Sequence, residues 1–233
     1  VVFLRTAWPP TSFYAAMEDE ELMNGIFTAT EDAGFETVAW LTAGTRNFYA
    51  TVPIRTPADL KGKKIRVQQS PTNVRMMELF GAAAAPMSFG EVYTAIQQGV
   101  IDGAENNELA LTNNKHGEVA KYYTYNQHQM VPDMLIANLK FLEELPPEER
   151  TVFDGAAKEC NRVEREEWDA LTEAAKQQAE GMGVEFLYPD IAPFKELVLP
   201  LHEEILQSNE KLKPIYDRIQ DIAAEAGKEQ GNE

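Results

Sequence analysis

Residues 56–107 read TPADLKGKKIRVQQSPTNVRMMELFGAAAAPMSFGEVYTAIQQGVIDGAENN, and they contain two consecutive strand–helix units. In the first unit, Ile65 and Val67 alternate with polar residues, which is the period-two pattern of a strand with one buried face. A helix fits over 72–80, and Gly81 is expected to end it. Arg66 then lies on the opposite face of the strand from Ile65 and Val67. It is also near the carboxyl end of the strand, where open α/β sheets bind their ligands.

The second unit begins with the apolar run 83–87, which predicts another strand. Ser88 and Glu91 form the pattern of a capping box at the start of a helix, and Gly99 is expected to end that helix. Residues 102–103 predict a turn that places residues 105–107 in a loop. Two segments with polar side chains therefore reach the same edge of the predicted sheet.

Arg66 and Asn106 are the side chains of these segments that suit an anionic ligand. The guanidinium fork of arginine presents two parallel N–H donors to the two oxygens of a carboxylate. The amide of Asn106 can donate to a carboxylate oxygen and can accept from a hydroxyl. On the residues alone, a solvated or ion-paired arginine and a turn asparagine remain the alternatives.

The composition is that of a globular protein with a strong negative charge. The 233 residues are 44% hydrophobic and 25% charged, and the formal net charge is -17. This charge argues against nucleic acid as a partner, because nucleic-acid phosphates require a basic face. It does not exclude an anionic ligand, since a few groups inside a cleft decide selectivity. We find no apolar run of roughly 20 residues and no leader at residue 1, so we expect that an export signal is absent from this sequence.

The rest of the chain predicts further helices and strands. A helix is expected over 17–33, strands over 37–41, 47–54 and 122–125, and a strand buried on both faces over 130–139. Residues 146–181 predict one unusually long helix that could brace two lobes, with Cys160 buried in it. A short strand over 184–187 is followed by helices over 192–226, interrupted at Pro200 and Pro214.

Catalytic and metal-binding patterns are weak in this sequence. Ser88 lacks the first glycine of a nucleophile elbow, and a capping role explains it better. The three histidines, His116, His128 and His202, are scattered, with no HExxH motif and no cysteine pair. No glycine-rich phosphate loop is present. We therefore expect no metal and no cofactor.

Four elements in the opening stretch carry a family resemblance by their order and spacing. They are DLKG at 59–62, KIRV at 64–67, the block GAAAAPMSFGEVYTAIQQGVIDG at 81–103, and the EN pair at 105–106. Together they resemble the signature region of the TRAP-transporter solute-binding proteins, extracytoplasmic receptors that capture small carboxylates for a membrane permease. The resemblance runs from about residue 40 to 145 and continues loosely into the long helix and the tail.

The resemblance implies an α/β fold of the two-lobed periplasmic binding protein type, with the long helix spanning both lobes. The expected lobes are residues 1–43 with 132–170, and residues 44–131 with 171–233. Relatives normally open with a strand–helix–strand unit, and this sequence is expected to start after it. The resemblance further implies a monomeric, exported periplasmic receptor that binds a small organic acid, works with TRAP permease subunits and is not an enzyme.

The resemblance also assigns site residues. It implies that Arg66 is the main ligand of the substrate carboxylate, that Asn106 and Arg46 assist it, and that Phe89 flanks the ligand. Asn107 is also expected to bind the ligand, and Trp40, just before the G-x-R turn, to line the pocket.

Several alternatives stay open at this point. The paired asparagines at 106 and 107 and the histidine at 116 resemble family members associated with sugar acids such as uronates or aldonates. Dicarboxylates and keto acids remain possible ligands. A different class would be an enzyme acting on a carboxylate, with His128 or Glu105 as its acid or base, and a third would be the ligand-sensing domain of a signalling receptor.

Overall fold

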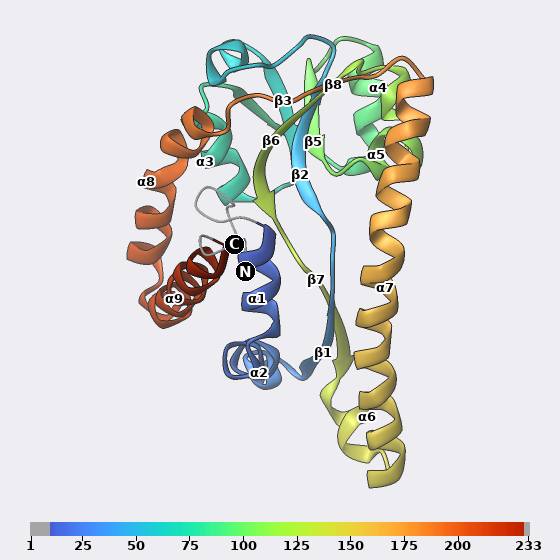
Figure 1. Ribbon diagram of the computed structural model, residues 1–233, viewed down its shortest axis with the longest axis vertical. Coiled ribbons are helices and arrows are strands. Elements are labelled where there is room, and N and C mark those ends of the chain that lie inside the picture. Colours follow the sequence, from blue (N-terminus) through green and yellow to red (C-terminus); the bar gives the residue numbers. More distant parts are fainter. Residues whose placement is uncertain (1–9, 231–233) are drawn as a thin grey trace.

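The computed structural model describes residues 10–230, which form a larger and a smaller sheet with helices around them (Figure 1). The strands are β1 (Phe35–Leu41), β2 (Thr45–Ala50), β3 (Lys64–Val67), β4 (Ala83–Pro86), β5 (Gly103–Asn106), β6 (Tyr122–Met130), β7 (Asp133–Asn138) and β8 (Glu185–Leu187). The helices are α1 (Pro10–Glu18), α2 (Glu20–Thr28), α3 (Pro71–Leu79), α4 (Val92–Gln97), α5 (Leu109–Thr112), α6 (Leu139–Glu144), α7 (Pro147–Gly181), α8 (Ala192–Ser208) and α9 (Lys213–Gln230).

The larger sheet has the strand order β4-β3-β5-β2-β6-β8 and a hydrophobic cluster on each face. Ile65 and Val67 belong to the cluster on the α3 and α8 side together with Phe48, so the alternation predicted for the KIRV strand is confirmed. Tyr49 belongs to the other cluster, on the side of α4 and α5. Phe48 and Tyr49 lie on opposite faces because consecutive residues of a strand point to opposite sides.

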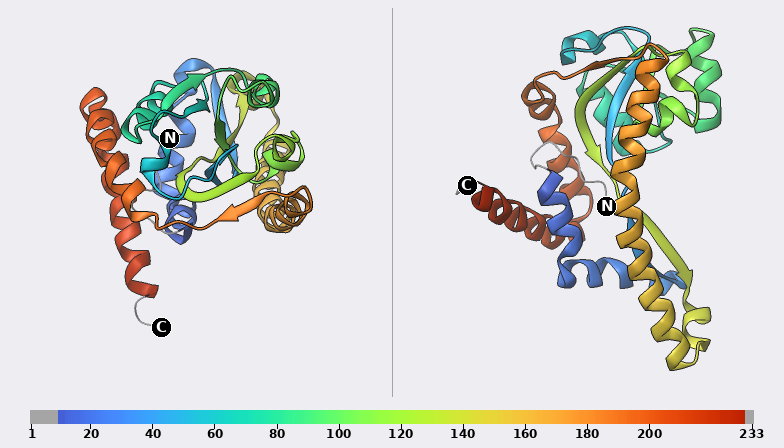
Figure 2. Two further views of the ribbon diagram at one scale, coloured as in Figure 1. Left: turned by 90° about the horizontal axis from the view of Figure 1, so that it is seen from above. Right: turned by 45° about the vertical axis from the view of Figure 1, so that its right-hand side comes forward.

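Two strands of the larger sheet continue directly into the smaller one. β1 leads into β2 through residues 42–44, and β6 leads into β7 through residues 131–132. The smaller sheet is the antiparallel pair β1-β7, and α1, α2 and α9 pack around it through a third hydrophobic cluster. Figures 1 and 2 show α7 running along the length of the molecule beside both sheets, and it contacts β1 at one level and α5 at another. The prediction of one long helix that spans both bodies is confirmed, whereas the residue boundaries of the lobes stay a prediction.

The helix expected over 17–33 is instead two helices and a 3-10 turn. The Asp19 side chain accepts a hydrogen bond from the backbone N–H of Leu22 at 2.8 Å, so it caps a new helix directly after α1. Gly34, with φ of 84°, ends the 3-10 turn Glu31–Ala33. A capping aspartate inside a helical pattern was the signal for this break.

Three other expectations are wrong. β7 is not buried on both faces, because Leu135 and Ile136 are 41% and 54% exposed, and among the described residues the strand pairs only with β1. Cys160 is exposed, because α7 buries only a narrow alanine stripe. Pro200 lies inside α8, where buried Val198 and Leu201 pack into the core and the helix continues.

Candidate functional site

The Arg66 guanidinium lies near the carboxyl end of β3, and two of its three nitrogens are hydrogen-bonded. Its Nε and Nη2 both donate to the backbone oxygen of Met87, at 3.0 and 2.8 Å. Its Cζ lies 5.4 Å from the centre of the Phe89 ring. Within residues 10–230, Nη1 makes no hydrogen bond. Burial lowers the pKa of Arg66, but an arginine remains charged at neutral pH.

Asn106 lies on the same sheet face as Arg66, although it is in strand β5 and not in the loop that the sequence predicts. Ile65 pairs with Gly103 in the parallel ladder of β3 and β5, so Arg66 and Ala104 lie on the same face. Side chains alternate along a strand, and Asn106 therefore lies on that face too. β5 also pairs with β2, which explains why these residues are extended. Gly103 is required at this contact, because a Cβ there would lie 2.4 Å from the Tyr49 backbone oxygen.

The orientation of the Asn106 amide is fixed by two donors. Its Oδ1 accepts from Nη1 of Arg46 at 3.2 Å and from the backbone N–H of Asn107 at 2.9 Å. The Nδ2 group is therefore the donating end, and it makes no hydrogen bond to any described residue. Arg66 and Asn106 thus present donors on one face, at the ends of two neighbouring strands.

Arg46 forms a buried ion pair and does not present an open fork. Its Nε lies 2.5 Å from Oε2 of Glu105, and its Nη2 donates to Oε1 at 2.9 Å and to the Glu105 backbone oxygen at 3.0 Å. Burial alone would raise the pKa of Glu105, but the charge and hydrogen bonds of Arg46, together with His128, lower it to about 2. This geometry makes Arg46 a residue that orients Asn106.

His128 extends this buried network on the face opposite to Arg66. Its Nε2 lies 3.4 Å from Oε2 of Glu105, and its ring stacks on Phe48 at 4.8 Å. Burial lowers the pKa of His128. Glu105 pairs with Phe48 across the strands, so it faces the same side as His128. The two residues considered as an acid or base are therefore separated from Arg66 by the sheet.

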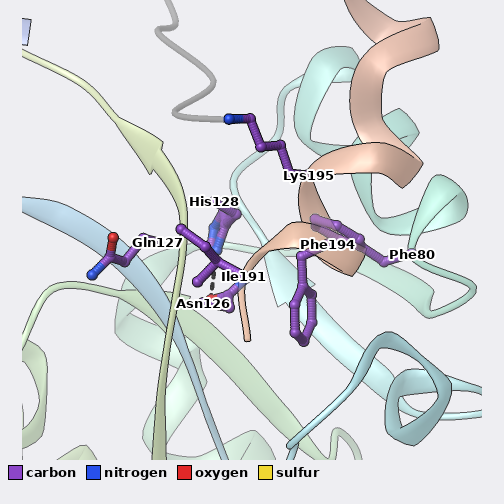
Figure 3. Close-up of a pocket in the computed structure, with 7 residues that line it drawn as sticks. All are labelled: Phe80, Asn126, Gln127, His128, Ile191, Phe194 and Lys195. Atoms are coloured by element: carbon purple, nitrogen blue, oxygen red, sulfur yellow. Dashed lines mark hydrogen bonds between the residues drawn. The ribbon is translucent and has the colours of Figure 1, made fainter. Parts of the chain in front are cut away.

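A small pocket lies next to His128 on that face (Figure 3). Asn126 Oδ1 lies 3.1 Å from Nδ1 of His128 and accepts from the backbone N–H of Phe48 at 3.2 Å. The Gln127 side chain points away from His128 in Figure 3. Gln127 has a φ of 52° and lies in the part of β6 where the pairing with β2 shifts register. The pocket is lined by Phe80, Asn126, Gln127, His128, Ile191, Phe194 and Lys195.

Two residues outside the six expected ligand-binding residues lie on the Arg66 face, and one of them is His116, the histidine that the resemblance linked to sugar acids. The His116 ring packs edge-on against Phe89 at 5.2 Å between ring centres. The Tyr49 hydroxyl lies 2.7 Å from Nδ1 of His116. The alternation of β2 could have placed Tyr49 opposite Phe48, but only the folded structure brings His116 to it.

Asn107 and Trp40, the two remaining candidates, make structural contacts within the chain. The Asn107 amide donates to the Ala43 backbone oxygen at 3.0 Å and accepts from the Leu109 N–H at 3.2 Å, so it ties the β1–β2 connection to α5. Trp40 packs in the cluster of the smaller sheet, 6.2 Å from the Phe13 ring centre. The structure therefore groups Arg66 with Phe89 and Arg46 with Asn106, and a ligand role for the six candidates stays a prediction.

The described part of the chain holds neither a metal-binding cluster nor a membrane-crossing helix. Across residues 10–230, no three His, Cys, Asp or Glu side chains are grouped so that they could hold a metal ion. None of the helices described is both long and apolar enough to cross a membrane.

Comparison with known proteins gives consistent matches. Residues 11–209 match the family model DctP, described as bacterial extracellular solute-binding protein, family 7. A protein of Salmonella typhimurium, YiiZ, which is described as uncharacterized, is 42% identical over 89% of this chain and 64% of its own length. The C4-dicarboxylate-binding periplasmic protein DctP of Rhodobacter capsulatus is 30% identical over 78% of this chain and 56% of its own length. The chain thus spans less than two thirds of these relatives.

Solved structures of TRAP periplasmic solute-binding proteins superpose closely on this chain. One from Anaerococcus prevotii, with bound α/β-D-glucuronate, has a TM-score of 0.90 and 53% identity, and the match covers 97% of this chain and 73% of that one. Another from Xanthobacter autotrophicus, with bound β-D-galacturonate, has a TM-score of 0.88 and 37% identity, covering 96% of this chain and 73% of that one.

Proposed function

Because the chain belongs to family 7 of the bacterial extracellular solute-binding proteins, we propose that the full-length protein is a periplasmic receptor for a uronate-type sugar acid. In this proposal the receptor is a monomer, binds the acid between its lobes and delivers it to the membrane permease of a TRAP transporter. The choice of a uronate is supported by the two solved relatives above, which hold D-glucuronate and D-galacturonate.

The observation that carries the proposal is the placement of Arg66 and Asn106. Both lie on one face at the carboxyl ends of β3 and β5, and each has nitrogen donors that no described residue uses. A uronate offers a carboxylate for the Arg66 nitrogen and hydroxyls for the Asn106 amide. The hydrogen bonds from Arg66 to Met87 hold the guanidinium in place before ligand arrives, which reduces the ordering cost of binding.

The geometry supports binding more than catalysis. Glu105 is engaged by Arg46, its pKa of about 2 keeps it ionised, and it lies on the face opposite to Arg66. A general acid or base works best with a pKa near the working pH and within hydrogen-bond reach of the substrate. Glu105 meets neither condition, because its pKa is far below neutral pH and it lies across the sheet from a ligand bound at Arg66.

The test is a ligand screen on the purified full-length protein. Native mass spectrometry should reveal a co-purified acid, and thermal unfolding should show stabilisation by D-glucuronate or D-galacturonate that grows with ligand concentration. Succinate at the same concentration should stabilise the protein less. Stronger stabilisation by succinate than by every uronate or aldonate would replace the sugar acid with a dicarboxylate, and no response to any small carboxylate would overturn the receptor proposal.

The Arg66→Ala variant tests the carboxylate contact. Its affinity for D-glucuronate should fall by about 2 to 5 kcal/mol, the usual cost of removing one partner of a buried charge pair. Arg75→Ala is the matched control, because Arg75 is an exposed arginine paired with Glu78 and Glu204 away from the site. Calorimetry that gives similar affinities for the wild type and Arg66→Ala would remove Arg66 from the site.

A further inference from the structure

Tyr49 and His116 form a buried hydrogen-bonded pair next to the proposed carboxylate site. Both side chains are buried, and the Tyr49 hydroxyl lies 2.7 Å from Nδ1 of His116. The His116 ring is 5.2 Å from the Phe89 ring, and the Arg66 Cζ is 5.4 Å from that same ring. One aromatic ring therefore contacts both His116 and Arg66.

The hydrogen bond from Tyr49 fixes the tautomer of His116. Burial, together with the charge of Glu105, raises the pKa of Tyr49 far above its usual value, so the phenol keeps its proton. Nδ1 of His116 is its hydrogen-bond partner in the described part of the chain, and a buried hydroxyl proton needs an acceptor. Nδ1 therefore accepts, and the neutral ring carries its proton on Nε2.

His116 stays neutral at physiological pH. Burial and the positive charge of Arg66 lower its pKa to about 4. The Nε2–H group makes no hydrogen bond to any of residues 10–230. His116 thus offers one uncharged donor beside Arg66, on the sheet face that also carries Asn106.

We propose that His116 is a specificity-determining residue, whose Nε2–H donates to a ligand oxygen on the carbon chain or ring next to the carboxylate that Arg66 binds. The inference rests on the receptor function proposed above. It assigns the ligand to carboxylates that carry a hydroxyl or ring oxygen close to the acid group, as uronates and aldonates do. Tyr49 acts through His116 as a positioning residue.

Three variants of the full-length protein test this role by calorimetry with D-glucuronate. His116→Leu removes the donor and should weaken binding about 10-fold, because a ligand oxygen loses its partner. His116→Gln has an amide N–H that can reach the position of Nε2, so it should recover affinity to within about 3-fold of the wild type. His202→Gln replaces another histidine, on α8, and should bind as the wild type does.

A double-mutant cycle separates the positioning role of Tyr49 from a structural one. Tyr49→Phe alone should weaken binding about 2- to 5-fold, because Nδ1 is then free to carry the proton. In the His116→Gln background the same change should have no further effect on affinity. An equal loss in both backgrounds would overturn the positioning role.

The outcomes also distinguish this inference from the proposed function. A folded His116→Leu variant that binds D-glucuronate within twofold of the wild type, in a series where Arg66→Ala loses binding, overturns the His116 assignment and leaves the receptor function standing. If His116→Leu does not fold, His116→Gln and Tyr49→Phe decide by the criteria above. A wild-type protein that binds no uronate or aldonate overturns both proposals.

Discussion

Asn106 and Asn107 are neighbours in sequence, but their side chains have different surroundings. Asn106→Ala should weaken uronate binding by about 0.5 to 1.5 kcal/mol, the contribution of a neutral hydrogen bond. Asn107→Ala should instead lower the free energy of unfolding by about 1 kcal/mol, since it removes two structural hydrogen bonds. Calorimetry and thermal unfolding of both variants measure this contrast. A large loss of affinity in Asn107→Ala without loss of stability would contradict it.

The buried Arg46–Glu105 pair predicts a pH-dependent contribution to stability. Glu105→Gln leaves the Arg46 charge without its carboxylate and should cost about 3 to 5 kcal/mol of unfolding free energy at pH 7. The pKa of Glu105 falls from an ordinary value of 4.5 to about 2 on folding. Its carboxylate therefore stabilises the fold fully above pH 4.5, and this contribution is lost as the pH falls from 4.5 towards 2.

Urea unfolding at pH 7, 5 and 3 checks this prediction. The difference between wild type and Glu105→Gln should be constant from pH 7 to 5 and smaller at pH 3. Glu143→Gln, an exposed position on α6, is the control and should stay near the wild type at each pH. An unchanged difference at pH 3 would mean that ionisation of Glu105 is not what stabilises the pair.

Single residues differ in how far the sequence determines them. The strand alternation around Arg66 was sufficient to predict its face, because Ile65 and Val67 flank it directly. The partner of Arg46 could not be predicted, since Glu105 is 59 residues away and meets it only through the register of β2 and β5. The resemblance suggested Arg46 as a ligand contact, and the structure shows its fork occupied by Glu105.

At the scale of a single element, the 3-10 turn His116–Glu118 begins after a strained residue. Lys115 precedes it with φ of 59°, a left-handed conformation that costs a non-glycine residue about 1 to 2 kcal/mol. Lys115→Gly should therefore raise the unfolding free energy by up to about 1 kcal/mol after the extra chain entropy of glycine is subtracted. Lys158→Gly, the same change inside α7, should lower it by about 1 kcal/mol. Denaturant unfolding of both variants is the measurement, and a destabilised Lys115→Gly would refute the strain.

Elements with strong local signals were predictable, whereas elements set by distant contacts were not. The Ser88–Glu91 capping box and the long helix α7 are both confirmed, because their signals lie within a few turns of chain. The continuation of α8 through Pro200 depends on burial against α3, which no local pattern reveals. The exposure of β7 likewise depends on which elements cover the smaller sheet.

At the scale of the whole molecule, the net charge of -17 predicts a salt-dependent association rate. The field of exposed charges extends about 30 Å in 0.01 M salt and about 8 Å in 0.15 M salt. An anionic uronate should therefore associate faster as salt rises over this range, with little change in its dissociation rate. Stopped-flow measurements on the full-length protein test this. A rate that falls with salt would show that the local field of Arg66 outweighs the net charge.

The two-body arrangement follows from how strands are shared between the sheets. The resemblance implied two lobes, but the residues alone did not show that β2 and β6 both continue into the smaller sheet. Those continuations depend on the pairing of β1 with β7 and of β2 with β6. The paired residues lie between 72 positions (Ala50 and Tyr122) and 103 positions (Phe35 and Asn138) apart in sequence. The same pairing places Trp40, six positions before Arg46, in the hydrophobic cluster of the smaller sheet, whereas Arg46 lies in the larger sheet and pairs with Glu105.

Cys160 is the single cysteine of this sequence, and its exposed position on α7 makes it a handle for site-directed fluorescence. The next residue, Asn161, donates to the Trp40 backbone oxygen at 2.6 Å, so a maleimide dye at residue 160 would sit beside the contact between α7 and β1. A dye at that point reports on its surroundings without any engineered substitution. Its emission during a titration would show whether ligand binding at the proposed site on β3 and β5 changes the contact between α7 and β1.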